Sequence, residues 1–482
     1  MCKCLNKFEQ SRRQFLRTAS FASMSGLYAS PFILGLNSLA AMAQNTGASD
    51  YKALVCVFLQ GGNDGHGTVI ATDSDSYNAF VTARSGAPGL AYPISQLLPI
   101  TLNTPQSGRT FALNPYLGGV QNLFNAGRAA IVANSGTLIA PATKAQVNAN
   151  SVPLPASLFS HFDQTAAWQA IASNGGSAEH IGWGGSVADL IESMNMNSNS
   201  MFTCISTAGI ALFLAGQTSF QLNVTPAGPI PISGLAQPLF GNSAGTQALN
   251  SILTADETNL FAKEYEVVVD RSIQAQALLA SSMLTAGPTG VPNPPQYLDP
   301  TTNMLADNPL AASLQTVARI IGGRASLGVT RQIFYVQLGS FDTHDGQAAT
   351  HAKLLTQLGQ ALEYFDGLMQ TFGLGNQVTT FTASDFGRTL TCNSDGTDHG
   401  WGSHHFVVGG AVQGHDMYGQ YPVVGADQAN DVGAGRLIPT TSVDQYAGTL
   451  ARWFGLSDGQ VRTVLPNFGN FGSSPYLGFM GS

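Results

Sequence analysis

The sequence holds 482 residues and a net charge of −8, and only 10% of its residues are charged, against about a quarter in a typical soluble protein. This negative balance, with no basic run beyond the first twenty residues, argues against a nucleic-acid partner. A chain of this length can bury a large core, as one domain with an inserted cap or as two domains.

The first 43 residues are expected to form an export signal. Ser11-Arg12-Arg13-Gln14-Phe15-Leu16 reads as a twin-arginine motif, and a weakly apolar stretch then leads to the small-x-small site Ala41-Met42-Ala43. A transmembrane anchor fits less well, because Gly, Pro and Asn interrupt the apolar run. We predict a mature chain over 44–482, periplasmic or secreted, with the twin-arginine translocase as partner during export and no stable membrane anchor.

The three cysteines of this mature chain are Cys56, Cys204 and Cys392. Cys56 lies in an apolar run and is expected in a buried strand. The sequence leaves open a disulfide between the other two. No CxxC pair occurs, which argues against a thiolate zinc site.

Strands and helices alternate from residue 53. The apolar run 53–59 is predicted as a buried strand that ends in the glycine-rich turn 60–65. The next expected elements are a helix over 115–127, a strand over 129–133 and a helix over 159–171, capped by Ser160. Residues 190–305, which mix short apolar segments, a helical stretch over 253–284 and a Pro- and Gly-rich loop, are predicted as an insertion or cap.

The alternation resumes after residue 305. We expect helices over 309–321, 349–372 and 443–454, and strands over 332–338, 378–383 and 406–412. This order predicts an α/β fold: a doubly wound, mostly parallel sheet with helices on both faces.

Acidic and histidine side chains follow three of the predicted strands. They are Asn63 and Asp64, then Asp342, His344 and Asp345, then Asp385, with Asp398 and His399 in a later glycine-rich loop. Ligands bind beyond the carboxyl ends of strands in such sheets, and these side chains suit Zn, Mn, Mg or Ca. These residues also have interpretations that involve no metal. A lone Asp after a strand often caps a turn, and Asp342 and His344 could form a hydrogen-bonded turn. A further histidine, His351, is expected on the exposed side of its helix, as a surface residue.

Five segments occur in an order that resembles a known family. They are Gly61-Gly62-Asn63-Asp64-Gly65, Ser160-His161-Phe162-Asp163, Phe341-Asp342-Thr343-His344-Asp345, Ser384-Asp385-Phe386-Gly387-Arg388-Thr389 and Gly396-Thr397-Asp398-His399-Gly400. Together with the twin-arginine start, they resemble the bacterial family called domain of unknown function 1501 over nearly the whole mature chain. That family is placed in the alkaline-phosphatase and sulfatase superfamily. The resemblance implies an alkaline-phosphatase-like core, a metal site at the strand ends and, often, hydrolysis of phosphate or sulfate esters.

The resemblance also implies roles for particular residues. The metal ligands would be Asp64, Asp342, His344, Asp385 and His399. Ser160, at a helix start that favours an anionic group, would be the candidate nucleophile. Arg388 would clamp the anion bidentately, or else form a salt bridge that holds its loop.

Two departures from the superfamily pattern qualify these roles. Phe386 stands where the superfamily has a histidine, so a ligand is missing unless His161 or His404 replaces it. Ser160 lacks the Cys/Ser-x-Pro-x-Arg context of sulfatases, which leaves formylglycine chemistry unsupported. The leading hypothesis is an exported metal-dependent hydrolase of a phosphate or sulfate ester, and the alternative is a non-catalytic, metal-stabilised binding or assembly protein of the same fold. A third option is an enzyme that uses the fold for another transfer, such as mutase or lyase chemistry.

Overall fold

Strand β1 (Lys52–Leu59) lies inside a ten-stranded sheet, where it pairs in parallel with β11 (Arg331–Leu338) and β12 (Val378–Ser384). The computed structural model describes residues 50–170, 181–255 and 259–481, so the predicted export signal over 1–43 lies outside the described residues. Among the strands of this sheet in the described ranges, β15 and β8 alone run against the rest. The predicted mostly parallel α/β sheet is confirmed.

The strands follow the order β16-β5-β15-β12-β1-β11-β6-β7-β8 across the sheet, and β17 pairs with β5. The bounds of the remaining strands are β5 (Ala129–Gly136), β6 (Cys204–Ser206), β7 (Gln221–Thr225), β8 (Gly228–Pro229), β15 (Ser403–Val408), β16 (Asp416–Tyr418) and β17 (Thr441–Ser442).

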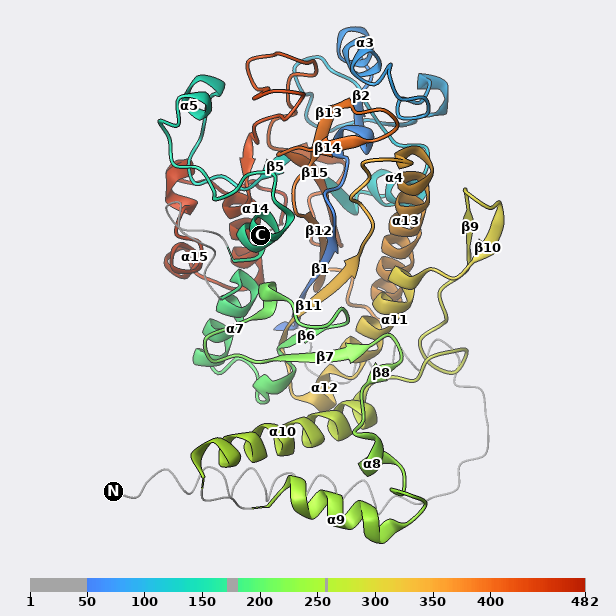
Figure 1. Ribbon diagram of the computed structural model, residues 1–482, viewed down its shortest axis with the longest axis vertical. Coiled ribbons are helices and arrows are strands. Elements are labelled where there is room, and N and C mark those ends of the chain that lie inside the picture. Colours follow the sequence, from blue (N-terminus) through green and yellow to red (C-terminus); the bar gives the residue numbers. More distant parts are fainter. Residues whose placement is uncertain (1–49, 171–180, 256–258, 482) are drawn as a thin grey trace.

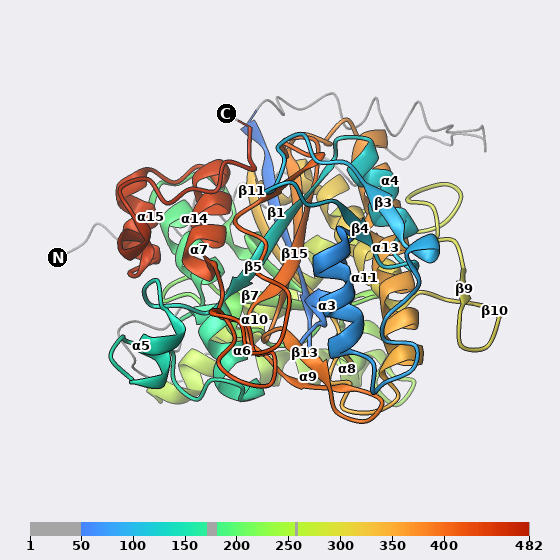
Figure 2. The ribbon, with the colours of Figure 1, turned by 90° about the horizontal axis from the view of Figure 1, so that it is seen from above.

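Helices cover both faces of this sheet, as Figure 2 shows. On one face lie α4 (Gly118–Asn125), α11 (Pro309–Gly322) and α13 (Gln347–Thr371), and on the other α7 (Trp183–Ser193), α14 (Val443–Phe454) and α15 (Asp458–Val464). In β1, Val55 and Val57 pack into the first core, whereas Leu54, Cys56 and Phe58 pack into the second. Successive side chains of a strand point to opposite faces, so the unbroken apolar run of β1 serves both cores.

Smaller elements surround the main sheet. The short strands are β2 (Val69–Ala71), β3 (Leu98–Ile100), β4 (Phe111–Leu113), β9 (Tyr297–Asp299), β10 (Met304–Ala306), β13 (Arg388–Cys392) and β14 (Thr397–His399). The other α-helices are α3 (Ser74–Ala83), α5 (Lys144–Asn148), α6 (His161–Ala170), α8 (Ser233–Ala236), α9 (Ser243–Leu253), α10 (Leu260–Ser282) and α12 (Arg324–Leu327). The segment 190–305, predicted as an insertion or cap, contributes β6, β7 and β8 to the main sheet, and its helices α8, α9 and α10 project from one end of the molecule (Figure 1).

The carboxyl ends of the central strands meet at one edge. Leu59 at the end of β1 pairs with Leu338 of β11 and Ser384 of β12. The loops that follow these three strands therefore start side by side. Gly61, in the first of these loops, has φ +114°, and a Cβ there would lie 2.3 Å from the backbone N of Asp342. A glycine is needed for this close approach.

One sequence prediction near this edge is wrong. His351 in α13 was expected on the exposed side of its helix, but it is buried, with Nε2 3.1 Å from Oδ1 of Asn63. The loop after β1 covers the start of α13 and removes the ring from water, and this burial lowers the pKa of His351 to about 4.

Two further features concern the described residues. Cys56, Cys204 and Cys392 are all free thiols, and Cys56 lies in β1 as predicted. No helix in the described ranges combines the length and apolar character that crossing a membrane requires.

Candidate metal centre

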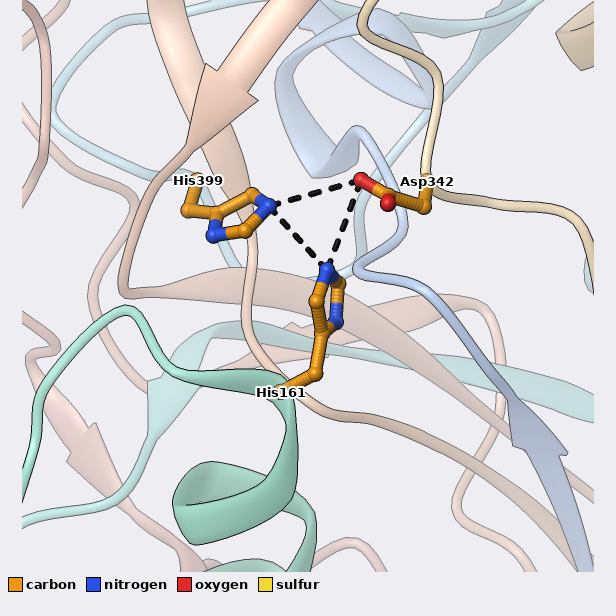
Figure 3. Close-up of side chains that lie close together, drawn as sticks. All are labelled: His161, Asp342 and His399. Atoms are coloured by element: carbon orange, nitrogen blue, oxygen red, sulfur yellow. Dashed lines mark hydrogen bonds and ion pairs between the residues drawn. The ribbon is translucent and has the colours of Figure 1, made fainter.

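Three side chains from distant elements bring their ligand atoms together beyond the carboxyl edge of the sheet (Figure 3). His161 begins α6, Asp342 follows β11 and His399 ends β14. The Nε2 atoms of His161 and His399 are 3.0 Å apart, and each lies 3.4 Å from Oδ1 of Asp342. Ligand atoms bound to one tetrahedral zinc ion at 2.0–2.1 Å are about 3.3 Å from one another. The triangle therefore has the size of one face of a metal coordination sphere.

A third histidine borders this triangle. Nε2 of His344 lies 2.9 Å from Nε2 of His399 and 3.1 Å from Oδ1 of Asp342. The His344 side chain is 44% exposed, more than that of His161 or His399. His344 is therefore placed either to complete the coordination of the same ion or to stand beside it.

The backbone fixes which nitrogen of His399 faces the triangle. Nδ1 of His399 lies 2.7 Å from the carbonyl oxygen of Phe159. A carbonyl only accepts hydrogen bonds, so Nδ1 carries the proton and the neutral ring presents an unprotonated Nε2. Phe159 adopts φ +74°, a left-handed conformation that is strained for a bulky residue. In this conformation the carbonyl oxygen of Phe159 contacts Nδ1 of His399 and so orients the ring.

The other two rings are oriented by carboxylates. Nδ1 of His161 lies 2.7 Å from Oδ2 of Asp385, and Nδ1 of His344 lies 3.2 Å from Oδ1 of Asp398. Three imidazoles thus have Nδ1 beside an acceptor and Nε2 turned toward a carboxylate oxygen, so each ring, when neutral, presents an Nε2 lone pair to the triangle. These lone pairs repel one another unless a cation lies among them. Metal-binding histidines in proteins show this same pattern of supporting contacts, so the residues fit a divalent metal.

Burial and charge act differently on the two inner histidines. The hydrogen bond to Asp385 raises the pKa of His161, although burial opposes this shift. Burial lowers the pKa of His399, and the bond to the Phe159 carbonyl opposes that shift. The ring of His161 also packs on Phe386, with centroids 4.7 Å apart. His161 therefore lies beside Asp385 and Phe386, where the sequence lacked a histidine.

Arg388 holds Asp342 in place. Its Nη1 donates to Oδ1 of Asp342 at 2.7 Å and to the carbonyl of Gly61 at 3.2 Å, and its Nε and Nη2 donate to Thr397. Burial would raise the pKa of Asp342, but Arg388 lowers it below its usual value. The side chain of Arg388 is fully buried. Of the two roles considered from the sequence, the geometry favours the salt bridge that fixes the loop over the anion clamp.

Asp385 supports the centre instead of lining it. Its Oδ2 contacts His161, and its Oδ1 accepts the backbone N–H of Gly61 at 3.0 Å. Both oxygens are thus occupied by protein donors, and the structure does not bring Asp385 into the triangle. Asp385 was predicted as a metal ligand, but its contacts are those of a residue that orients a ligand.

Asp64, the first predicted ligand, also lies outside the triangle. It is buried, and its two oxygens accept from Nη1 and Nη2 of Arg84 at 2.7 and 2.9 Å. Burial would raise the pKa of Asp64, but the guanidinium of Arg84 lowers it well below its usual value. The cation that faces Asp64 is therefore a side chain of the same protein.

A chain of hydrogen bonds joins Asp64 to the triangle. Gln347 donates to Asp64 Oδ2 at 2.7 Å and accepts from the Thr397 hydroxyl at 2.6 Å. Thr397 in turn accepts from Nε of Arg388 at 3.3 Å, and Arg388 contacts Asp342. Asp64 thus helps to build the site from beneath.

Neither of two other residues weighed from the sequence enters the triangle. The Ser160 hydroxyl lies 3.5 Å from the backbone N of Asp163, at the start of α6, which is a capping position. His404 is buried, and its Nδ1 accepts from the backbone N–H of Asn134 at 3.0 Å. Of the two histidines considered as replacements for the missing ligand, His161 is the one at the centre.

A cavity of about 580 Å³ opens beside His161, Asp342 and Asp385. Its remaining wall is amide, hydroxyl and apolar, including Gln60, Gln169, Gln337, Tyr335, Phe162 and Ile210. Phe162 and Ile210 are 84% and 85% exposed, so two apolar side chains stand at the cavity without being part of the core. No Lys or Arg is among the described residues that line it.

Sequence reasoning missed two supporting groups. The carbonyl of Phe159 left no sequence signal, because any residue has a carbonyl and its orientation comes from a backbone conformation. Asp398 was noted only as a neighbour of His399, whereas in the structure it contacts His344. His161 was detectable, since it lies in one of the recognised segments and the pattern lacked one histidine.

Comparisons with known proteins place the chain in a family without an assigned activity. The model of a family described as "Protein of unknown function (DUF1501)" matches residues 51–466. A search of curated proteins found no match.

The solved structures to which this chain is similar include a sulfatase, a lipoteichoic acid synthase and an alkaline phosphatase. The PsFucS1 sulfatase from Pseudoalteromonas sp. is 8% identical, with 94% of this chain and 75% of that chain covered and a TM-score of 0.33. The lipoteichoic acid synthase LtaP from Listeria monocytogenes is 9% identical, with 90% and 81% covered and a TM-score of 0.32. The alkaline phosphatase from the Antarctic bacterium TAB5 is 9% identical, with 74% and 90% covered and a TM-score of 0.25.

Proposed function

Because the chain belongs to the DUF1501 family of proteins of unknown function, we propose its activity from its own site: divalent-metal-dependent hydrolysis of a phosphate or sulfate ester. The observation that carries this proposal is the convergence of imidazole Nε2 atoms on Oδ1 of Asp342, each ring held by an acceptor at Nδ1.

The ligand set narrows the choice of metal. Neutral imidazoles with one carboxylate suit zinc or manganese, whereas magnesium and calcium prefer oxygen ligands. His161, His399 and Asp342 would hold the ion, and His344 lies next to them. A bound divalent ion would polarise the ester oxygen and make an attacking water more acidic.

The chain's own groups would bind and orient the ester. The N-terminus of α6 lies at the cavity through His161 and Phe162, and the backbone N–H groups of a helix start favour an anionic group. Asp385 keeps His161 in the tautomer that presents Nε2, and Arg388 keeps Asp342 in place. With Ser160 in a capping position, the proposal requires no serine nucleophile.

The cavity wall disfavours a second negative charge on the alcohol side of the ester bond. A negatively charged tail would find no Lys or Arg among the described lining residues, and would be repelled by Asp342 and Asp385. Gln60 and Gln337 instead offer amide groups, while Phe162 offers an exposed ring face. We therefore expect an ester of an alcohol that has both polar and apolar surface and carries no negative charge of its own.

The positions of Arg388 and Ser160 favour a second, non-catalytic function. Arg388 is buried beneath Asp342, and Ser160 lies at a helix cap, so neither the anion clamp nor the nucleophile implied by the resemblance is positioned for chemistry. If His344 completes a four-ligand sphere, the centre resembles a closed structural metal site. The alternative is thus a metal-stabilised binding or assembly protein.

The cellular setting belongs to the same proposal. The N-terminal twin-arginine motif supports export through the twin-arginine pathway to the periplasm or beyond. A centre assembled from distant loops forms only on folding, which suits a pathway for folded proteins. The net charge of −8 supports a partner other than nucleic acid.

The test combines metal analysis with turnover. Purified protein would be analysed for zinc and manganese and assayed with p-nitrophenyl phosphate and p-nitrophenyl sulfate. We expect about one bound ion per chain, turnover that is lost in His399→Ala, and turnover that is retained in the matched variant Ser160→Ala. Metal without turnover on any ester supports the binding protein instead. Protein that binds neither ion after incubation with both overturns the two functions together.

A further inference from the structure

Helices α9 and α10 project from the end of the molecule opposite β13 and β14 (Figure 1). Helix α9 has no buried residue, and in α10 only Ala275 and Leu279 are buried. We call α9 and the first half of α10, residues 243–253 and 260–270, the helical arm. Because helices in proteins are stabilised mainly by packing an apolar face, an arm with so little packing calls for a partner.

One face of α10 links the arm to the core. Ala275 and Leu279 belong to the main hydrophobic core on one side of the sheet. On the same face, Phe261, Tyr265 and Val268 are 85%, 63% and 44% exposed. The spacing of four and three residues along this stripe is that of helices that pair side by side. The stripe therefore begins in the core and continues, uncovered, along the arm.

The uncovered apolar surface is large enough for a stable interface. The arm and the segment leading to it also expose Ile230, Phe240, Ile252 and Leu260, at 61%, 96%, 74% and 78%. An aromatic side chain buries on the order of 150–250 Å² and an aliphatic one somewhat less, so the seven side chains together expose on the order of 1,000 Å². A standard interface buries about 800 Å² on each partner.

The charges of α10 indicate the kind of partner. This part of the helix carries three acidic residues, Glu264, Glu266 and Asp270, and two basic residues, Lys263 and Arg271. Helices that lie on membranes are rich in Lys and Arg on their polar face, which this helix is not. A nearly balanced set of acidic and basic side chains beside an apolar stripe is compatible with the same surface of a second copy of this chain.

We propose that the helical arm is a dimer interface, in which the Phe261, Tyr265 and Val268 stripe of one chain packs on the same stripe of a second copy. Such a contact is closed by a two-fold axis, because each chain offers the same surface. The arm lies at the opposite end of the molecule from β14, the strand that ends at His399 (Figure 1), and no residue of the arm is among those that line the cavity, so dimerisation leaves the cavity open.

The test is the mass of the full chain in solution, measured by light scattering and sedimentation equilibrium. We expect a dimer for the wild type, and a dissociation constant raised about 100-fold or more in Phe261→Asp/Tyr265→Asp, because central aromatic residues dominate interfaces. The matched control is Leu305→Asp on β10, a leucine that is 65% exposed outside the arm, which should remain dimeric. Circular dichroism would confirm that the variants are folded.

Two outcomes overturn the proposal. One is a wild-type chain that stays monomeric at about 100 µM; binding of that monomer to phosphatidylcholine vesicles would then assign the arm to a lipid surface. The other is a dimer that the double substitution leaves intact while the fold is retained, since the contact would then lie elsewhere.

Discussion

Nδ1 of His161 lies 2.7 Å from Oδ2 of Asp385, and this contact turns the other nitrogen of the ring toward His399 and Asp342. A carboxylate behind a histidine fixes its tautomer and makes its free nitrogen a stronger ligand. Asp385, although it does not face the centre, therefore controls one of its ligands.

Asp385→Asn should weaken metal binding about 10- to 100-fold, the usual effect of removing such a supporting carboxylate. The asparagine amide donates as well as accepts, so the preference of His161 for a proton on Nδ1 is lost. Zinc titration of metal-free protein would measure the change. The matched control is Asp398→Asn, because Asp398 Oδ1 contacts His344 and the amide of Asn393 and not His161. Equal affinity in Asp385→Asn and wild type would contradict the role assigned to this contact.

His344→Ala should distinguish an open centre from a closed one. If His161, His399 and Asp342 hold the ion, the variant keeps its metal and turnover changes by less than about tenfold, because three protein ligands leave one position for substrate. His399→Ala should lose the metal and serves as the comparison. Elemental analysis of both variants after dialysis would distinguish an open centre from a closed one. Loss of metal from both variants would indicate a closed four-ligand site and favour the non-catalytic function.

Asp64→Asn should destabilise the fold by about 3–5 kcal/mol, because it leaves the buried guanidinium of Arg84 without its counter-charge. Urea unfolding would measure this loss. The remaining folded protein should keep its metal, since Asp64 does not contact the triangle. A stable variant that has lost its metal would instead restore Asp64 as a ligand, as the family resemblance implies.

Asp444 at the start of α14 should make stability depend on pH. Burial raises the pKa of Asp444 to about 7, and its Oδ1 has no hydrogen-bond partner among the described residues. The folded state thus keeps its proton up to about pH 7, whereas the unfolded chain loses it near pH 4. The free energy of unfolding should therefore fall as pH rises from about 4 to 7, by on the order of 4 kcal/mol from this group.

Asp444→Asn tests this dependence. Asparagine keeps the shape without the titration, so the variant should be more stable than wild type at pH 7 and similar to it at pH 4. Urea unfolding of both proteins at several pH values gives the comparison. Parallel pH profiles for the two proteins would show that Asp444 is already ionised in the folded state.

Most of the framework could be predicted because it depends on local patterns. The apolar run predicted strand β1, and the apolar stripe predicted helix α13. Pro309 predicted the start of α11. Each of these signals depends only on residues that are close together in the sequence. The convergence of the loops after β1, β11 and β12 was also predictable, because parallel strands end at one edge. His351 was misplaced because its burial comes from a loop that is distant in sequence.

The chemistry of the site divides in the same way. The sequence by itself determined the α/β alternation, the family and which residue types meet at the sheet edge. Only the tertiary structure decided that Asp342, His161 and His399 face one another, that Asp385 and Arg388 stand behind them, and that Asp64 faces Arg84. The physical reason is that a carboxylate can bind a metal, orient a histidine or neutralise an arginine, and its three-dimensional neighbours select which of these it does.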